Sequence, residues 1–144
     1  SWKGIQKMNE DIQTKYIYYQ QLMQQMQQLQ ENSQALEKHI HDLYNLKSNL
    51  ENIPDLNINE ESLMSLGNGI FLKGNLKDNK NVLMSVGAGV CVEKNIGDAA
   101  DTVNKQIADV LGLSEQINLE MQNIFENLQE VQKELQDLDK NSKK

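Results

Sequence analysis

The sequence predicts a mostly α-helical chain with a small β insert, a long antiparallel two-helix coiled coil whose helices are joined by two β-hairpins. Three observations lead to this prediction. Apolar residues recur in heptads over both ends of the chain, and a segment in the middle occurs twice at an interval of twenty residues. The apolar content is low for a compact domain, with 38% hydrophobic and 5% aromatic residues, which favours elongated helices that bury a stripe. At 144 residues the chain is expected to be one domain, 1–144.

The first helix is expected over residues 5–53, where two rows of residues follow the a and d positions of a heptad repeat. Five successive d positions, from Leu22 to Leu50, are leucine. Such a pattern is typical of a helix that packs against a second helix along one stripe. The two rows are Ile5, Ile12, Tyr19, Met26, Ser33 and Ile40, and Met8, Lys15, Leu22, Leu29, Leu36, Leu43 and Leu50.

A glutamine-rich stretch changes the composition of this helix but not its pattern. Six of the ten residues in 21–30 are glutamine, a composition typical of disordered low-complexity segments. Leu22, Met26 and Leu29 nevertheless continue the heptad, and glutamine is a fair helix former, so the helix is expected to run through. Pro54 cannot donate a helical hydrogen bond and ends the helix.

Residues 54–97 form the expected β insert, built on an internal repeat. Residues 63–78 (LMSLGNGIFLKGNLKD) and 83–98 (LMSVGAGVCVEKNIGD) are identical at seven of sixteen positions. Each copy contains a G-x-G turn, in which glycine adopts positive φ at little cost. Short runs with apolar residues at every second position flank each turn, as in half-buried strands. The strands are expected at about 63–66, 69–76, 82–86 and 89–94.

The second helix is expected over residues 98–140, with Asp98 as its N-cap. It carries five heptads with a single polar residue in the seam, a strong coiled-coil pattern. Residues 141–144 are expected to be a flexible tail. The two rows are Val103, Val110, Ile117, Ile124, Val131 and Leu138, and Ile107, Ser114, Met121, Leu128 and Leu135.

The two predicted helices match in length, at roughly 40 residues or about 60 Å each. A β insert between them lets them fold back on each other, with Leu50 near Val103 and Met8 near Leu138. We therefore expect a rod with the hairpins at one end and both termini at the other.

The hairpins are expected to be the assembly element. Two hairpins alone are marginally stable, and their outer strands leave backbone N–H and C=O groups unpaired. Pairing with hairpins of other chains, closing into an intersubunit β-barrel, satisfies these groups. The residues expected in the subunit interface are Leu63, Leu66, Ile70, Leu72, Leu76, Val82, Met84, Val86, Val90 and Val92.

Charge and composition exclude several partners. The formal net charge of −7 disfavours nucleic acid and anionic membrane surfaces, which bind mainly through Lys and Arg. No apolar run approaches the roughly 20 residues that span a bilayer, and no basic start with a following apolar region indicates a signal peptide. Cys91 is the only cysteine, which favours a reducing setting, so a cytoplasmic protein is expected.

No set of residues predicts catalysis, a cofactor or a metal site. His39 and His41 face different ways on a helix, which favours surface positions over metal binding. Cys91 has no histidine near it in the sequence and is best interpreted as a small buried or interface side chain. The G-x-G pairs lack the GK[ST] of a P-loop and the context of a dinucleotide-binding turn. The chain is therefore not expected to be an enzyme.

The chain resembles the prefoldin family, specifically its α-type subunits, in the order of its segments. This order is a helix, then LMSLGNG, then DNKNVLMSVGAGVCVEKN, then a second helix. The most specific part is residues 82–95, VLMSVGAGVCVEKN, which is similar to the second hairpin of archaeal α subunits and their eukaryotic counterparts. Two hairpins indicate the α type, because β-type subunits carry one. Gly74-Asn75 departs from the more regular strand of the family.

This resemblance implies an ATP-independent holdase and chaperonin cofactor. The implied assembly is an α2β4 hexamer with β-type subunits, a double β-barrel that carries six coiled-coil tentacles. Their tips hold unfolded client proteins and transfer them to a group II chaperonin. The apolar residues near the proposed tip that would bind clients are Ile5, Met8, Ile12, Tyr16, Val131, Leu135 and Leu138.

Other interpretations fit the same pattern. A coiled-coil scaffold or spacer, or a filament-forming structural protein, would use the hairpins for assembly and bind no client. A periplasmic, jellyfish-shaped chaperone also joins a β body to helical arms, although the acidic charge disfavours it. The tip residues have an alternative role as ordinary seam residues of the coiled coil.

Overall fold

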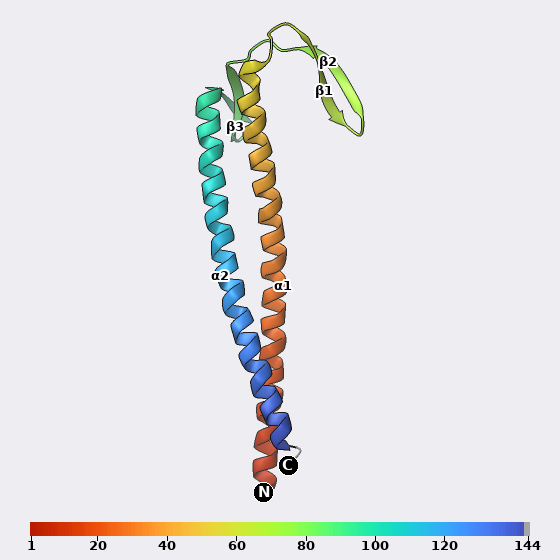
Figure 1. The fold of residues 1–144 in the computed structure, drawn as a ribbon, viewed down its shortest axis with the longest axis vertical. Helices are drawn as coiled ribbons and strands as arrows, with labels where there is room; N and C mark the ends of the chain where they lie inside the picture. Colours follow the sequence, from red (N-terminus) through yellow and green to blue (C-terminus); the bar gives the residue numbers. More distant parts are fainter. Residues whose placement is uncertain (143–144) are drawn as a thin grey trace. The chain divides into compact units, whose positions relative to one another are not determined.

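The computed structural model describes residues 1–142, and it confirms two long helices with two small antiparallel hairpins between them (Figure 1). Residues 143 and 144 of the predicted tail lie outside the described part, whereas Asn141 and Ser142 belong to the last helix. The elements are α1 (Trp2–Asn52), the 3₁₀ helix η1 (Ile53–Asp55), β1 (Glu61–Gly67), β2 (Ile70–Asn75), β3 (Asn81–Gly87), β4 (Val90–Asn95) and α2 (Ile96–Ser142).

The chain divides into two compact units, which we describe separately. The helical unit consists of Ser1–Lys38 and the part of the chain that follows Val110. The hairpin unit consists of His39–Val110 and contains the four strands, the end of α1 and the start of α2.

In the helical unit, α1 and α2 pack antiparallel along the predicted heptad rows. Leu22 of α1 and Leu128 and Val131 of α2 are buried and form one cluster. Because the buried positions follow the seven-residue period, each helix presents one apolar stripe to the other. The partly buried residues packed against this cluster are Tyr19, Met26, Ile124 and Leu135, all four of them predicted seam residues.

In the hairpin unit, the same rows supply most of the buried side chains. Leu43 and Leu50 are buried on α1, and Val103 is the most deeply buried large side chain among the described residues, with 2% of its surface exposed. Burial of both rows within one unit indicates that the two helical segments pack on each other there. The buried residues of α2 in this unit are Ile96, Ala99, Val103, Ile107 and Val110.

The start of α2 differs from the prediction. Asn95, not Asp98, is the N-cap, because its Oδ1 accepts a hydrogen bond of 2.7 Å from the backbone N–H of Asp98. The Asp98 carboxylate in turn accepts a hydrogen bond from the Asn95 side-chain amide, at 3.1 Å. This reciprocal arrangement resembles a capping box, in which a cap and the third helical residue satisfy each other. The helix therefore begins at Ile96, which adds a buried residue to its seam.

The two hairpins are separate two-stranded sheets with the same register. In β1–β2, Met64 lies opposite Leu72 and Leu63 opposite Lys73. At the turns, Asn68 and Ala88 both have positive φ, at 52° and 53°, and the following glycines are also positive. Positive φ at both central residues is what a two-residue type I′ hairpin turn requires. The repeat in the sequence is thus a repeat in structure.

The link between the hairpins is held by side-chain hydrogen bonds. Asp78 Oδ1 accepts from the backbone N–H groups of Lys80, at 2.8 Å, and Asn81, at 3.1 Å. The N–H of Lys80, followed by the side chain of Asn81, holds the pKa of Asp78 below its ordinary value. The Asn79 side-chain amide donates to the carbonyl of Leu56, at 3.0 Å. These contacts fix the link as an Asx-type turn tied to the segment that follows α1.

Candidate functional site

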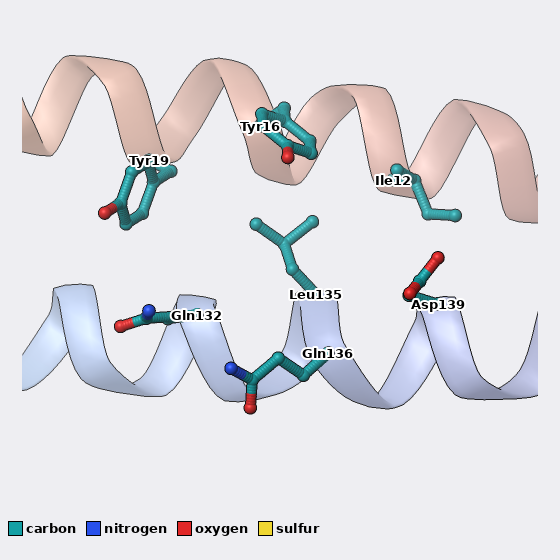
Figure 2. Close-up of a pocket in the computed structure, with 7 residues that line it drawn as sticks. All are labelled: Ile12, Tyr16, Tyr19, Gln132, Leu135, Gln136 and Asp139. Carbon is teal, nitrogen blue, oxygen red and sulfur yellow. The ribbon is translucent and has the colours of Figure 1, made fainter.

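The helical unit contains a groove of about 430 Å³ between α1 and α2 (Figure 2). Ile12, Tyr16 and Tyr19 line it from α1. From α2 it is lined by Gln132, Leu135, Gln136 and Asp139. Figure 2 shows Leu135 pointing from α2 towards Tyr16, and Asp139 facing Ile12. Ile12, Tyr16 and Tyr19 follow one another at steps of four and three residues, and Gln132, Leu135 and Asp139 at steps of three and four, so the groove follows the helix axes.

The groove is lined by both apolar and polar side chains. Tyr16 has 55% of its surface exposed, and a tyrosine offers both an aromatic face and a hydroxyl to whatever lies against it. The amides of Gln132 and Gln136 are donors and acceptors on the opposite helix. Such a surface can hold an apolar segment of another chain without demanding one sequence.

An ion pair lies close to the groove. The Lys15 ammonium, from a seam position of α1, lies 2.5 Å from Glu134 Oε2 of α2. The hydrogen bond to Glu134 raises the pKa of Lys15 above its ordinary value. This contact lets a cation occupy a d position of the heptad, because the acid on the facing helix satisfies it.

The structure separates the seven predicted client-binding residues by position. Ile12, Tyr16 and Leu135 line the groove. Ile5 is exposed, whereas Met8 and Leu138 are half-buried. Val131, with 5% of its surface exposed, belongs to the core cluster, so a client can reach it only where the helices separate.

Four lining residues were not among those predicted: Tyr19, Gln132, Gln136 and Asp139. Tyr19 was assigned to the seam alone. Gln132 and Asp139 lie three residues before and four residues after Leu135, a helical spacing that places them beside it, whereas Gln136 follows it directly and had no such signal. None of these three polar residues belongs to the apolar heptad rows.

The second candidate site is the apolar surface of the hairpins. Side chains opposite each other in an antiparallel pair share a face. One face therefore carries Met64, Leu72 and Ile70 in the first hairpin, and Met84, Val92 and Val90 in the second. Nearly all of these side chains lie open in the isolated chain, and only Met84 is half-buried.

The predicted interface residues do not all lie on one face of the hairpins. Leu63 lies opposite Lys73 and so on the other face from Met64, and Leu76 lies beyond the end of β2. Three apolar residues of the hairpins were not in the predicted set: Met64, Phe71 and Leu83. Leu83 has 73% of its surface exposed. Both faces of each hairpin are thus partly apolar, which was not evident from alternation in one strand alone.

Other kinds of site receive no support within residues 1–142. No group of three or more His, Cys, Asp or Glu residues in this part could hold a metal ion. No helix there is long and apolar enough to cross a bilayer. Cys91 is a free, exposed thiol on β4 opposite Ser85.

Comparisons with known proteins agree with this geometry. A family model described as "Prefoldin subunit" matches residues 22–141. Among solved structures, a chain of the filamentous PFD of Methanocaldococcus jannaschii, determined by cryo-EM, has a TM-score of 0.70 and 16% identity. That match covers 80% of this chain and 95% of the other, and at this identity it shows the fold. A sequence comparison with curated proteins finds no match.

Proposed function

This chain belongs to the prefoldin family, and from that premise we propose that it is an α-type subunit of an ATP-independent holdase in the cytoplasm. In this proposal it joins β-type subunits in an α2β4 hexamer, captures unfolded proteins in the helical unit and transfers them to a group II chaperonin. It catalyses no reaction and needs no cofactor. The observation that carries the proposal is the pairing of two open features in one chain, an apolar groove and two uncovered hairpins.

The assembly part of the proposal is supported by the hairpins. Each is a two-stranded sheet with exposed apolar residues on both faces, an arrangement that is marginal in water on its own. Joining hairpins of other subunits in a barrel would cover these faces and pair the outer strands. The presence of two hairpins supports the α type.

The client part is supported by the groove. Prolonged contact with many different unfolded segments needs apolar area and adaptable polar groups rather than a shaped pocket. The groove offers Ile12, Leu135 and the rings of Tyr16 and Tyr19, with amides beside them. Several such grooves in one assembly would give avidity while each single contact stays weak enough to release.

Binding of a fluorescently labelled, denatured client to the assembled complex, without nucleotide, tests the groove. We expect Tyr16→Ser to weaken client binding by roughly three- to tenfold, because an exposed aromatic contact of about 1 kcal/mol is lost in each subunit. The matched control is Leu119→Ser, which removes a side chain equally exposed on α2 outside the groove. Equal client affinity of Tyr16→Ser and wild type, with assembly intact, would remove the groove from the client site.

A second function has specific support. The similar solved structure is described as filamentous, and open hairpin edges can join chains end to end as readily as they close a barrel. In that alternative the chain is a structural or spacer subunit of a filament without client binding. The form of the assembly distinguishes the two functions: the holdase predicts a closed complex, and the filament subunit predicts an open-ended polymer.

A further inference from the structure

The groove belongs to a longer side of the helical unit. A second groove of about 420 Å³ lies between the same two helices and is lined by Gln30, Ser33, Gln34, Glu37 and Met121. Tyr16 of the first groove and Gln30 of the second are two heptads apart on α1, so they lie on the same side of that helix. Both grooves therefore open on one side of the helix pair.

Glutamine dominates this side. It consists of the positions that directly follow the two seam rows, within residues 6–34 of α1 and 118–136 of α2, and we call it the amide face. Tyr16 and Met23 of α1 and Phe125 of α2 add exposed aromatic and apolar surface to it. On α2, three positions at heptad intervals are Gln122, Gln129 and Gln136. On α1, five positions at heptad intervals are all glutamine: Gln6, Gln13, Gln20, Gln27 and Gln34.

The amide face carries no charge, although the chain is acidic. All of its residues are glutamine, asparagine, tyrosine, methionine or phenylalanine, and all are exposed. Exposed helix faces usually carry charged residues, so an uncharged one points to contact with another molecule. The charged residues of the same helices include those that directly precede seam positions, namely Lys7, Asp11, Glu120, Glu130, Glu134 and Asp137.

The glutamine amides of this face are left open by the chain itself. Among the glutamines of α1, Gln28 alone has a side-chain hydrogen bond within the described residues, to Asn32 Oδ1 at 3.2 Å. Gln28 directly precedes the seam residue Leu29 and so lies outside the amide face. A glutamine amide both donates and accepts hydrogen bonds, and the amide face presents a row of such groups to the solvent.

We propose that the amide face binds the main chain of an extended, uncharged segment of an unfolded protein. The glutamine amides donate to the carbonyls of this segment and accept from its N–H groups. The proposal rests on the proposed function, in which the helical unit captures unfolded proteins. An unfolded segment presents a donor and an acceptor at nearly every residue, whatever its sequence. A charged segment is disfavoured, because it would lose water without gaining an opposite charge.

The dimensions of the amide face suit an extended chain. From Gln6 to Gln34 the row covers four heptads, or about 42 Å at 1.5 Å per helical residue. Successive glutamines of the row lie about 10 Å apart, close to the length of three extended residues at about 3.3 Å each. An extended segment laid along the row would therefore present a peptide group to each amide.

A helical segment would gain little from this face. Its N–H and C=O groups bond to one another along the helix, so the glutamine amides would find no partners in it. The proposal thus concerns segments that have not formed secondary structure. Tyr16 and Phe125 supply aromatic contact beside the hydrogen bonds.

Binding of a labelled, uncharged peptide of alanine, serine, threonine and leucine to the assembled complex, followed by fluorescence anisotropy, tests the proposal. The test variant is Gln20→Glu/Gln27→Glu, at two positions of the row that line neither groove. Glutamate keeps the shape of the side chain, removes the donor and sets a charge against the uncharged segment. We expect the variant to bind the peptide roughly three- to tenfold more weakly.

Gln21→Glu/Gln28→Glu is the matched control. Its two positions are exposed on the same helix with the same spacing, outside the amide face, and they add the same charge. We expect it to bind the peptide as the wild type does. Gln20→Ala/Gln27→Ala separates the lost hydrogen bonds from the added charge, and it should weaken binding by about threefold.

A peptide of the same composition in scrambled order tests whether the main chain is recognised. Main-chain groups are the same at every residue, apart from proline, so scrambling should leave the affinity unchanged. A loss of affinity would show that particular side chains are recognised instead.

Four results would overturn the proposal: wild-type affinity in Gln20→Glu/Gln27→Glu, an equal loss in the control, a loss on scrambling, or a wild-type complex that binds a denatured client but not the peptide. Self-association that Gln20→Glu/Gln27→Glu abolishes, with peptide binding unchanged, would assign the face to a second copy and overturn it as well. The proposed function stands in each case if the wild-type complex still binds the denatured client and Tyr16→Ser weakens that binding. A wild-type complex that binds no denatured client would count against the proposed function itself.

Discussion

At the scale of single residues, the two hairpin turns adopt the same backbone conformation with different side chains. Asn68 and Ala88 occupy the same turn position with φ of 52° and 53°. Asparagine tolerates this left-handed conformation, whereas alanine is strained in it by about 1 kcal/mol. The second hairpin therefore carries strain that the first avoids.

Ala88→Asn should stabilise the second hairpin by roughly 0.5–1 kcal/mol, because it relieves this strain. Asn68→Ala should destabilise the first hairpin by a similar amount. Hydrogen exchange of the β3 and β4 amides, compared with that of β1 and β2, measures each hairpin separately. Faster exchange in the second hairpin of Ala88→Asn would contradict the account of the turn.

At the same scale, the groove shows what the sequence could not provide. The heptad indicated that Lys15 occupies the seam, but its partner Glu134 depends on how far α2 is shifted along α1. The heptad pattern recurs every two helical turns, so it does not determine how far one helix is shifted along the other. Gln132, Gln136 and Asp139 became part of the groove through the same shift.

At the scale of elements, the seam was predictable almost completely. Predicted positions such as Leu22, Leu43 and Val110 are buried, because the seven-residue period is set by the helix itself. Helix ends were less predictable, since Asn95 and Asp98 are both good caps and only the backbone path selects one. The hairpin register followed from the repeat, whereas the assignment of Leu63 to a face needed the partner strand.

Gly112 offers a direct test of what stabilises α2. It lies inside the helix, and apart from the backbone of its own helix and its two chain neighbours, a Cβ added there would meet no heavy atom within 4 Å. Gly112→Ala should therefore raise the free energy of unfolding by roughly 0.5–1 kcal/mol, through the entropy that glycine loses in a helix.

Urea denaturation followed by helical circular dichroism measures this gain. Gly97→Ala is the control, because an added Cβ there lies 3.4 Å from Asn95 Oδ1, beside the cap of the first turn. A gain at Gly97 as large as that at Gly112, or no gain at Gly112, would contradict the propensity argument.

At the scale of the whole molecule, one chain carries two kinds of open surface. The helical unit offers a groove with apolar and amide groups, and the hairpin unit offers two separate two-stranded sheets with exposed apolar faces. Both surfaces are costly in an isolated chain, since exposed apolar area and unpaired edges promote association. Membership of the prefoldin family indicates assembly with other prefoldin subunits, which would cover surfaces of this kind.

The native mass of the chain after mixing with a β-type prefoldin subunit, compared with the chain alone, tests this account most directly. The account predicts a closed complex of two copies of this 16.5 kDa chain with four partners, formed at the expense of any self-association. A chain that leaves the β-type subunit unbound and grows into open-ended polymers would contradict it, and would establish the filament function instead.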